Sequence, residues 1–326
     1  MDNITHSLVG ALIGQAGLKR KTGLAMPALV IGANLPDVDA ACFFWLDGVQ
    51  HLGFRRGITH GPIAWVLLPL LLAGVLWWFD RWQASRRRRP EGRLPVHFGW
   101  LYALSFIACL SHPALDWLNV YGIRLLEPFS SRWFYGDTLF IIDVWLWALM
   151  GFATWFSLRR ERQGGEWRRP AQVAIMLTLI YIGGNWAWSI HTTAQWNRNL
   201  PNIEYAVLPP VGYPKTIASP VAFFPWQREI LWGGPYVWTR VPGGSSLTLE
   251  SAENEPTDLC SWPVLAELRT GGSQAGAFVF WSRAPFAERA SDGSVILHDA
   301  RFYDPRARDR FSVALPDVQC SPLAPR

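Results

Sequence analysis

Charged residues are scarce in this sequence of 326 residues. Asp, Glu, Lys and Arg make up 17% of the chain, whereas soluble domains carry about 25%. Half of the chain is apolar, and its 20 Trp residues gather near the ends of apolar runs, which is typical of a membrane–water interface. The shortage of charge and the placement of Trp therefore indicate an integral membrane protein.

Several familiar motifs are also missing. The N-terminal Met1-Asp2-Asn3 has no basic region and no clear cleavage site follows it, so we expect no cleavable signal peptide. The four Cys include no Cys-x-x-Cys pair, which argues against a thiolate zinc site. No His-Glu-x-x-His sequence occurs, which argues against an intramembrane zinc protease.

Four apolar runs are long enough to form membrane-spanning helices. They cover roughly 62–79, 98–118, 138–158 and 171–190, and about 20 residues are needed to cross the hydrocarbon. Each run read alone also fits a buried core helix. Four such runs in succession, with Trp at their ends, favour a polytopic helical bundle.

The first 46 residues predict a different arrangement. The apolar stretches 5–18 and 24–35 are each too short to span, and Lys19-Arg20-Lys21 separates them. We expect two half-length helices, or a hairpin packed against the bundle, because irregular backbone at membrane depth needs protein or a wet cavity around it.

Basic residues set the predicted orientation. The loop 81–93 carries six Arg and the loop 159–169 carries five, so both are expected on the cytoplasmic side. The segments 47–57 and 119–137 hold two Arg each and are expected outside. The chain then leaves the last helix on the outer side.

The C-terminal region differs in composition from the rest. The sequence predicts a membrane-embedded helical domain over 1–190 and an extracytoplasmic, β-rich domain over 191–326, with strands such as Ser246–Glu250 and Ala277–Trp281. Cys260 and Cys320 lie in this region and are able to form a disulfide in an oxidising compartment. The other two Cys, Cys42 and Cys109, lie in apolar runs and are expected to be buried.

Six ionisable side chains in or beside the helices are candidate metal ligands. They are His6, Asp37, Asp39, His60, His112 and Asp116, and His and Asp are common ligands of divalent metals. His112 and Asp116 are four residues apart, so they share one helix face. Each residue also has a plainer interpretation, as a helix-locking His–Asp hydrogen bond, an interfacial His, or an Asp in a turn.

The predicted topology brings all six side chains to the outer face. If 5–18 runs inward and 24–35 runs outward, His6 and the two Asp that follow 24–35 reach that side. His60 begins an inward helix, and the His112–Asp116 pair ends an outward one. Charged side chains at one depth argue for a single site.

A metal at this face has a direct chemical use. Zinc suits three His and three Asp, with manganese as the alternative, and an open coordination position would activate a water near neutral pH. We assign catalytic roles to Asp37, Asp39, His60 and Asp116. In the outer loop 119–137, Arg124 and Arg132 are able to hold an anionic group such as a phosphate, or to anchor the loop at the interface.

These motifs resemble the YdjM-like family of bacterial inner-membrane proteins, described as metal-dependent hydrolases and in some members as LexA-regulated. The resemblance covers roughly residues 1–150. It rests on Thr5-His6-Ser7, Pro36-Asp37-Val38-Asp39, Arg56-Gly57-Ile58-Thr59-His60-Gly61, and His112-Pro-Ala-Leu-Asp116 followed by Gly122 and Pro128-Phe129. The family implies a multi-pass protein of the inner membrane and hydrolysis that depends on a metal.

A fainter resemblance is to the zinc-dependent phospholipase C enzymes and related nucleases. Their order of ligands implies one zinc held by Asp37 or Asp39 with His60, His112 and Asp116. It implies a second zinc held partly by His6 with Asp116. The sequence departs from that pattern because it lacks a second His-x-x-x-Glu or His-x-x-x-Asp pair and the N-terminal Trp ligand, which puts a three-metal site in doubt.

One leading hypothesis and two rivals follow. The leading one is a membrane-bound, metal-dependent hydrolase that cleaves an ester or phosphoester of a phospholipid or another lipid-linked substrate at headgroup depth. The first rival is a membrane-anchored binding protein with a structural metal site. The second is a metal or proton transporter, which predicts charges at several depths. We expect membrane lipid as a partner and no nucleic acid.

Overall fold

The chain forms two compact units. The computed structural model describes residues 1–199, 215–233, 238–241, 260, 268, 273–305 and 307–321. The helical unit comprises Met1–Asp39 and Arg56–Trp186, and the sheet unit comprises Ala40–Arg55 and the described residues from Ala187 onward. Each unit has buried apolar clusters of its own.

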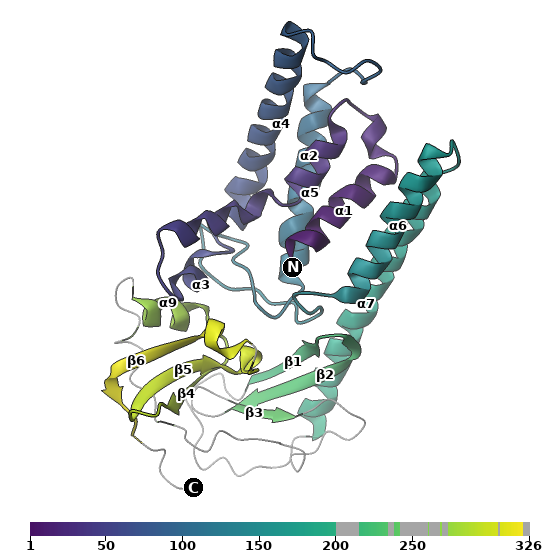
Figure 1. Ribbon diagram of the computed structural model, residues 1–326. Helices are drawn as coiled ribbons and strands as arrows, with labels where there is room; N and C mark the ends of the chain where they lie inside the picture. The colour runs from purple at the N-terminus through teal and green to yellow at the C-terminus, as the bar shows by residue number, and fades with distance from the viewer. Residues whose placement is uncertain are drawn as a thin grey trace. The chain divides into compact units, whose positions relative to one another are not determined.

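The helical unit is a bundle whose helices are joined by irregular connections, a long one of which links α5 to α6 (Figure 1). Its α-helices are α1 (Asn3–Gln15), α2 (Ala25–Gly32), α4 (Pro62–Ser85), α5 (Phe98–Trp117), α6 (Val144–Arg162) and α7 (Arg168–Asn199), whose last turns belong to the sheet unit. Single turns of 3-10 helix form η1 (Leu18–Arg20) and η3 (Ile58–His60), and a longer stretch forms η2 (Leu35–Phe44).

Among the described residues, three helices are long and apolar enough to cross a membrane. They are Pro62–Ser85, Phe98–Trp117 and Arg168–Arg198, which correspond to three of the expected runs. The helices α2 and η2 pass the same test only as a pair bent by 51°, the geometry of a broken span or a re-entrant loop. The expected class, a multi-pass helical region followed by a sheet-containing part, is confirmed.

The fourth expected span, over 138–158, needs correction. Helix α6 begins only at Val144, because the Asp143 carboxylate caps it and accepts hydrogen bonds from the N–H groups of Trp145 and Leu146. Its last turn carries Arg159, Arg160 and Arg162. Because of these charges, α6 does not pass the length and composition test that the other three helices pass, and the bent α2–η2 pair is the candidate that would bring the count to four.

The two N-terminal half-length helices pack as a hairpin. The basic turn η1 follows α1, and the helix α2 returns beside it (Figure 1). Gly10 permits this close approach, since a Cβ added there would lie 2.6 Å from the carbonyl oxygen of Leu29. Asn34 then ties the open end together by donating from Nδ2 to Ser7 Oγ at 2.9 Å.

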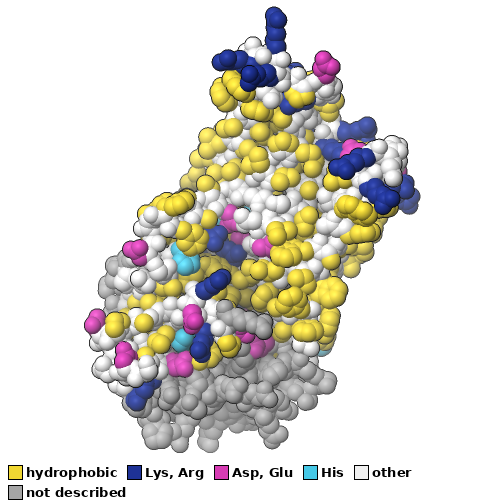
Figure 2. Space-filling view, in the orientation of Figure 1, with side chains coloured by type: hydrophobic (Ala, Val, Ile, Leu, Met, Phe, Trp, Pro, Cys, Tyr) yellow, Lys and Arg dark blue, Asp and Glu magenta, His cyan; other side chains and the backbone are white. Residues whose placement is uncertain are grey.

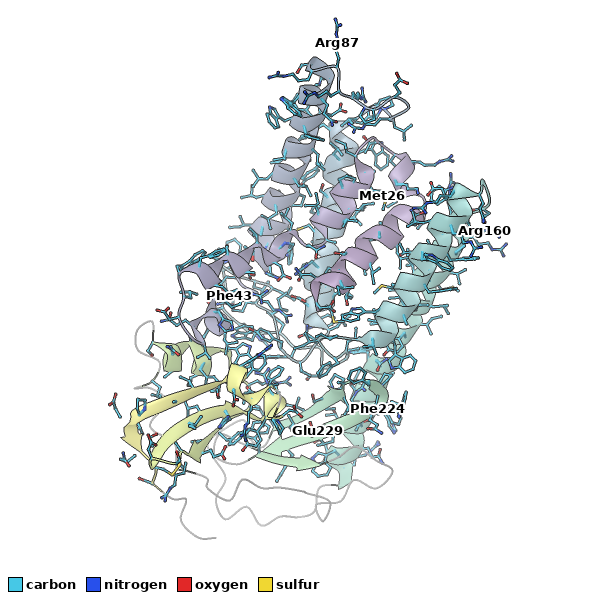
Figure 3. The ribbon with its side chains drawn as sticks, viewed as in Figure 1. Met26, Phe43, Arg87, Arg160, Phe224 and Glu229 are labelled. Carbon is cyan, nitrogen blue, oxygen red and sulfur yellow. A yellow bond between two sulfur atoms is a disulfide. The ribbon has the colours of Figure 1, made fainter. Side chains whose placement is uncertain are left out.

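The lipid-facing side of the bundle is apolar. Leu71, Trp78 and Ile180 are among the exposed large side chains of α4 and α7. Figure 2 shows an apolar band on this unit, with Lys and Arg gathered at the ends of the helices beyond it. Arg87 and Arg160 mark two of these basic ends (Figure 3). This distribution is what a bilayer-spanning bundle requires.

The sheet unit contains two antiparallel sheets. One has the order β1 (Lys215–Val221), β2 (Phe224–Gly233) and β3 (Trp238–Val241), and the other has the order β4 (Pro285–Arg289), β5 (Ser294–Asp299) and β6 (Ser312–Gln319). A shared cluster that includes Ile217, Leu231, Trp238 and Phe286 is buried between elements of both sheets. Phe224 and Glu229 lie on β2 (Figure 3).

One expected strand is a helix instead. Residues 277–281 belong to α9 (Gln274–Trp281), which packs against α3 (Gln50–Phe54) of the same unit. The buried side chains Ala275, Phe278 and Val279 follow helical spacing, and Ser273 caps the helix by accepting from Gly276 N–H. The alternation that predicted a strand was accidental. The other expected strand, Ser246–Glu250, lies outside the described residues.

A disulfide joins Cys260 and Cys320, as the sequence allowed, with the Cα atoms 5.2 Å apart. The N–H of Cys260 donates to the carbonyl oxygen of Ala287, and that of Cys320 donates to Gly293, so both cysteines are fixed beside the β4–β5 hairpin. Cys42 and Cys109 are buried and take no part in the disulfide; their burial was expected.

Candidate metal centre

All six expected ligands lie in one connected cluster of the helical unit. His6 comes from α1, the two Asp from η2, His60 from η3, and His112 and Asp116 from α5. His6, His60 and His112 have no exposed surface, and Asp116 is 1% exposed. Segments far apart in the sequence thus bring these six side chains together, and all but Asp37 are buried.

His112 lies at the middle of the cluster. Its ring stacks on that of His6 with centroids 3.7 Å apart, and its Nε2 is 3.6 Å from Asp116 Oδ2 and 3.8 Å from Asp37 Oδ1. Its Nδ1 lies 2.7 Å from the carbonyl oxygen of Ala33. Because a carbonyl only accepts, Nδ1 carries the proton and a neutral ring leaves Nε2 as a lone-pair donor.

The end of α2 explains why His112 is so placed. Ala33 is the C-cap of α2, and the last carbonyls of a helix have no partner within it. His112 satisfies one of them across 79 residues of sequence. A helix terminus therefore fixes the orientation of the imidazole.

The Asp116 carboxylate contacts groups from several segments of the site. Its Oδ1 is 3.4 Å from His6 Nε2 and also contacts the terminal ammonium of Met1. Its Oδ2 is 3.6 Å from His60 Nε2 and 3.0 Å from Arg56 Nε. A buried carboxylate is costly unless it is paired and hydrogen-bonded, and Arg56 meets that requirement.

Asp37 and Asp39 have different surroundings, which the sequence could not reveal. Asp39 Oδ2 accepts from the Arg56 N–H at 2.7 Å and from Thr59 Oγ1 at 3.3 Å, and it lies 3.6 Å from His60 Nδ1. Asp37 Oδ1 instead faces His112 Nε2, and this side chain is partly exposed. Asp39 thus holds the Arg56–His60 turn, whereas Asp37 points toward the histidines.

Two overlapping groups have ligand atoms close enough to share a metal ion. They are His6, Asp37 and His112, and His60, His112 and Asp116, with ligand atoms within 4.8 Å of one another in each. Both nitrogens of His6 and the Nε2 of His112 are buried without a hydrogen-bond partner among the described residues. Buried polar atoms normally have such partners, so this donor set fits a divalent metal.

The two arginines expected to bind substrate lie in different environments. Arg124 is buried, with its guanidinium 5.2 Å from the Trp133 ring centroid and 3.8 Å from Glu127. Burial lowers the pKa of Arg124, while the carboxylates of Glu127 and Asp39 oppose that shift. Arg132 is exposed and lies over Phe134. Arg124 therefore interacts electrostatically with Asp39, a carboxylate of the cluster.

Arg56 belongs to the site, although the sequence did not single it out. Its backbone has the unusual φ of 56°, and its Nη1 donates to Asn119 Oδ1 at 3.0 Å and to the Gly122 carbonyl at 3.2 Å. The guanidinium also lies 4.4 Å from the ring centroid of Tyr121. The signal was present in the Arg56–Gly61 motif, where Arg56 was counted only as an outer-loop charge.

Gly61 lets the loop 119–137 approach the chain that carries His60. A Cβ added at Gly61 would lie 1.9 Å from the carbonyl oxygen of Glu127, so any other residue would push the loop away. His60 precedes this glycine, and Trp65 Nε1 donates to the His60 carbonyl at 2.7 Å. The chain before α4 therefore packs closely against the loop at Glu127 and is hydrogen-bonded to Trp65 of α4.

The spans and the cluster define a multi-pass integral membrane protein with a buried His/Asp site able to hold a metal. The chain belongs to the YdjM inner membrane protein family, whose model matches residues 1–191. That match contains every residue of the site and places the protein in the inner membrane.

The chain is also similar to a Bacillus subtilis (strain 168) protein described as "Uncharacterized protein YfhP". The two are 26% identical over 193 residues, which is 56% of this chain and 52% of that relative. The chain thus matches about half the length of this curated relative. No solved structure matches the chain.

Proposed function

We propose that this protein is a metal-dependent hydrolase that acts on an ester or phosphoester at lipid-headgroup depth. One observation carries the proposal: buried imidazole nitrogens of His6 and His112 lie beside Asp37 and Asp116 with no hydrogen-bond partner among the described residues. Neutral imidazoles next to carboxylates are the usual ligands of zinc, and manganese is the alternative.

The residues divide into ligands and residues that orient them. His6, Asp37, His60, His112 and Asp116 are the ligands in this proposal. Asp39 orients His60 through the ring nitrogen that faces away from Asp116, an arrangement common around metal-bound histidines. A bound divalent metal would polarise the scissile bond and activate a water.

Other residues of the site balance the charge of its carboxylates and leave one side open to a substrate. Arg56 compensates Asp116 and keeps that carboxylate in place. Asp37 is the most exposed ligand, and the neighbouring Val38 is 54% exposed, so the site approaches the surface along η2. Arg124 is the candidate for holding an anionic part of the substrate.

The proposed substrate class follows from the depth of the site. His60 lies just before α4, and Asp116 is one residue from the end of α5, so the ligands lie at the ends of two spans, where headgroups are. The end of η2 carries the exposed Phe43 and Phe44, which suit a membrane interface. A phospholipid or another lipid-linked ester therefore fits.

We also propose that this end of the bundle and residues 191–326 are extracytoplasmic. The basic loops lie at the opposite ends of α4 and α6, and the positive-inside rule puts them in the cytoplasm. The Cys260–Cys320 disulfide supports the proposal, because disulfides persist in oxidising compartments.

A second candidate function has one observation in its favour. The cluster is nearly closed to solvent, with three histidines at 0% exposure, and structural metal sites are closed by protein ligands. A membrane-anchored binding protein with such a site is the alternative.

Turnover by purified full-length protein, with zinc or manganese added, separates the two. Phospholipid vesicles, a chromogenic phosphodiester and a chromogenic carboxylic ester would be tested beside an Asp37→Asn variant. We expect hydrolysis of at least one substrate, lost in a folded Asp37→Asn protein. Metal retained by the wild type without turnover of any substrate would favour the structural role.

A further inference from the structure

A second site lies at the other end of α5 from the metal centre. It is a shallow pocket of about 490 Å³ lined by Lys21, His97, Gly99, Trp100 and Ala103. Gly99 and Asp116 are separated by about 25 Å along the helix. The pocket therefore lies at the opposite membrane surface and plays no part in the proposed hydrolysis.

The pocket is built from two chain segments that are bonded to each other. The N–H of His97 donates to Thr22 Oγ1 at 2.8 Å, and the N–H of Gly23 donates to the Pro95 carbonyl at 2.9 Å. A Cβ added at Gly23 would lie 2.4 Å from the Leu94 carbonyl, so glycine is needed for this approach. The walls of the pocket are thus held together before any ligand arrives.

The side chains that line it suit an anion at an interface. The Lys21 ammonium lies 4.9 Å from the centroid of the exposed Trp100 ring. Two other cations at this end of the bundle face carboxylates: Lys19 faces Glu161, and Arg89 faces Asp80. In the described structure Lys21 lies over an aromatic ring instead, so its charge is available to a ligand.

We propose that this pocket binds the phosphodiester headgroup of an anionic phospholipid. It opens beside the first turn of a spanning helix, which lies at headgroup depth in a bilayer. Lys and Arg gather at this end of the unit (Figure 2), and basic pockets at the cytoplasmic ends of spans recognise anionic headgroups. A zwitterionic lipid has no net charge to complement Lys21.

Native mass spectrometry of the delipidated full chain in detergent tests the proposal. Phosphatidylglycerol and phosphatidylcholine with the same acyl chains would be titrated onto the wild type. The variants would be Lys21→Glu, which reverses the charge, and Gly99→Leu, which fills the pocket. A Cβ at Gly99 meets nothing within 4 Å, so the second variant should fold. Arg81→Glu is the matched control, since Arg81 is an exposed cation stacked on Trp77 outside the pocket.

We expect a preference for phosphatidylglycerol that weakens at least about fivefold in Lys21→Glu, since removing one cation is worth about fivefold and the new carboxylate adds repulsion. Gly99→Leu should also lose it, and Arg81→Glu should keep it. Equal binding of the two lipids, or equal losses in Lys21→Glu and Arg81→Glu, would overturn the proposal. Displacement of the lipid by millimolar inorganic phosphate would also overturn it, because the pocket would then be a site for free phosphate.

Discussion

Arg56 and Asp116 form a buried ion pair, with 3.0 Å between Nε and Oδ2. The pair joins the turn before α4 to the last turn of α5, and the Arg56 N–H reaches Asp39 as well. Arg56 holds the strained φ of 56°, and strain of this kind persists where its surroundings fix it. Arg56 thus positions carboxylates from two segments of the site, Asp116 through its guanidinium and Asp39 through its backbone N–H.

Removing this guanidinium should destabilise the protein strongly. Arg56→Ala removes the guanidinium that pairs with buried Asp116, and breaking a buried ion pair typically costs about 3–5 kcal/mol. Arg56→Lys keeps the charge but loses the fork that reaches Asn119, so we expect a smaller loss. Thermal unfolding in detergent measures both, with the exposed Arg132→Ala as the control. Equal melting temperatures for Arg56→Ala and Arg132→Ala would contradict the role given to this pair.

The two aspartates of η2 should behave differently when mutated. Asp37→Asn removes a ligand, so bound metal should fall even at saturating concentration. Asp39→Asn disturbs only the orientation of His60, and such changes cost about 10–100-fold in affinity, so full occupancy should return with excess metal. Metal titration followed by mass spectrometry distinguishes them. The reverse pattern would make Asp39 the ligand.

The Cys260–Cys320 disulfide should form in the cell and stabilise the sheet unit. The two cysteines are 60 residues apart in sequence, and closing a loop of that length is worth about 4 kcal/mol in the chain-entropy account. Acid trapping of intact cells followed by thiol alkylation should find this pair oxidised and Cys42 and Cys109 reduced. Free thiols at all four positions would contradict the extracytoplasmic placement of residues 191–326.

The sheet unit should lose stability in mild acid. His298 Nε2 lies 3.2 Å from Glu288 Oε2, and the Tyr303 hydroxyl donates to the same oxygen at 2.8 Å. These hydrogen bonds, the one to His298 first, lower the pKa of Glu288. Because the folded pKa lies below the unfolded one, the stabilisation is complete above the ordinary Glu value and disappears as pH falls through the lowered pKa.

Unfolding of the wild type and Glu288→Gln between pH 3 and about pH 7 would measure this contribution. We expect the difference between the two proteins to shrink as the pH falls. A difference that stays constant with pH would show that Glu288 does not titrate in this way.

Hydropathy and order of motifs predicted much of this molecule. Three spanning helices and the half-length pair followed from run length alone, and the order of His and Asp along the chain indicated which side chains would meet. The bounds of α6 were wrong because Asp143 starts that helix later, and Ala277–Trp281 was wrong because alternation over five residues is too short to exclude a helix.

The remaining details depend on three-dimensional contacts. Sequence could not separate Asp37 from Asp39, since their roles differ only by which of Arg56 and His112 each carboxylate faces. It also could not show that Arg56 turns inward, because an arginine between two helices usually lies in solvent. Ala33, whose carbonyl fixes His112, carries no side-chain signal at all.

Metal content tests the central claim most directly. Detergent-purified wild type and a His112→Ala/Asp116→Ala variant would be compared by inductively coupled plasma mass spectrometry, with circular dichroism to establish that both are folded. Because two ligand groups share His112, we predict about one or two equivalents of zinc or manganese in the wild type and none in the folded variant. Wild type without metal after incubation with both ions would contradict the metal centre and the hydrolase proposal built on it.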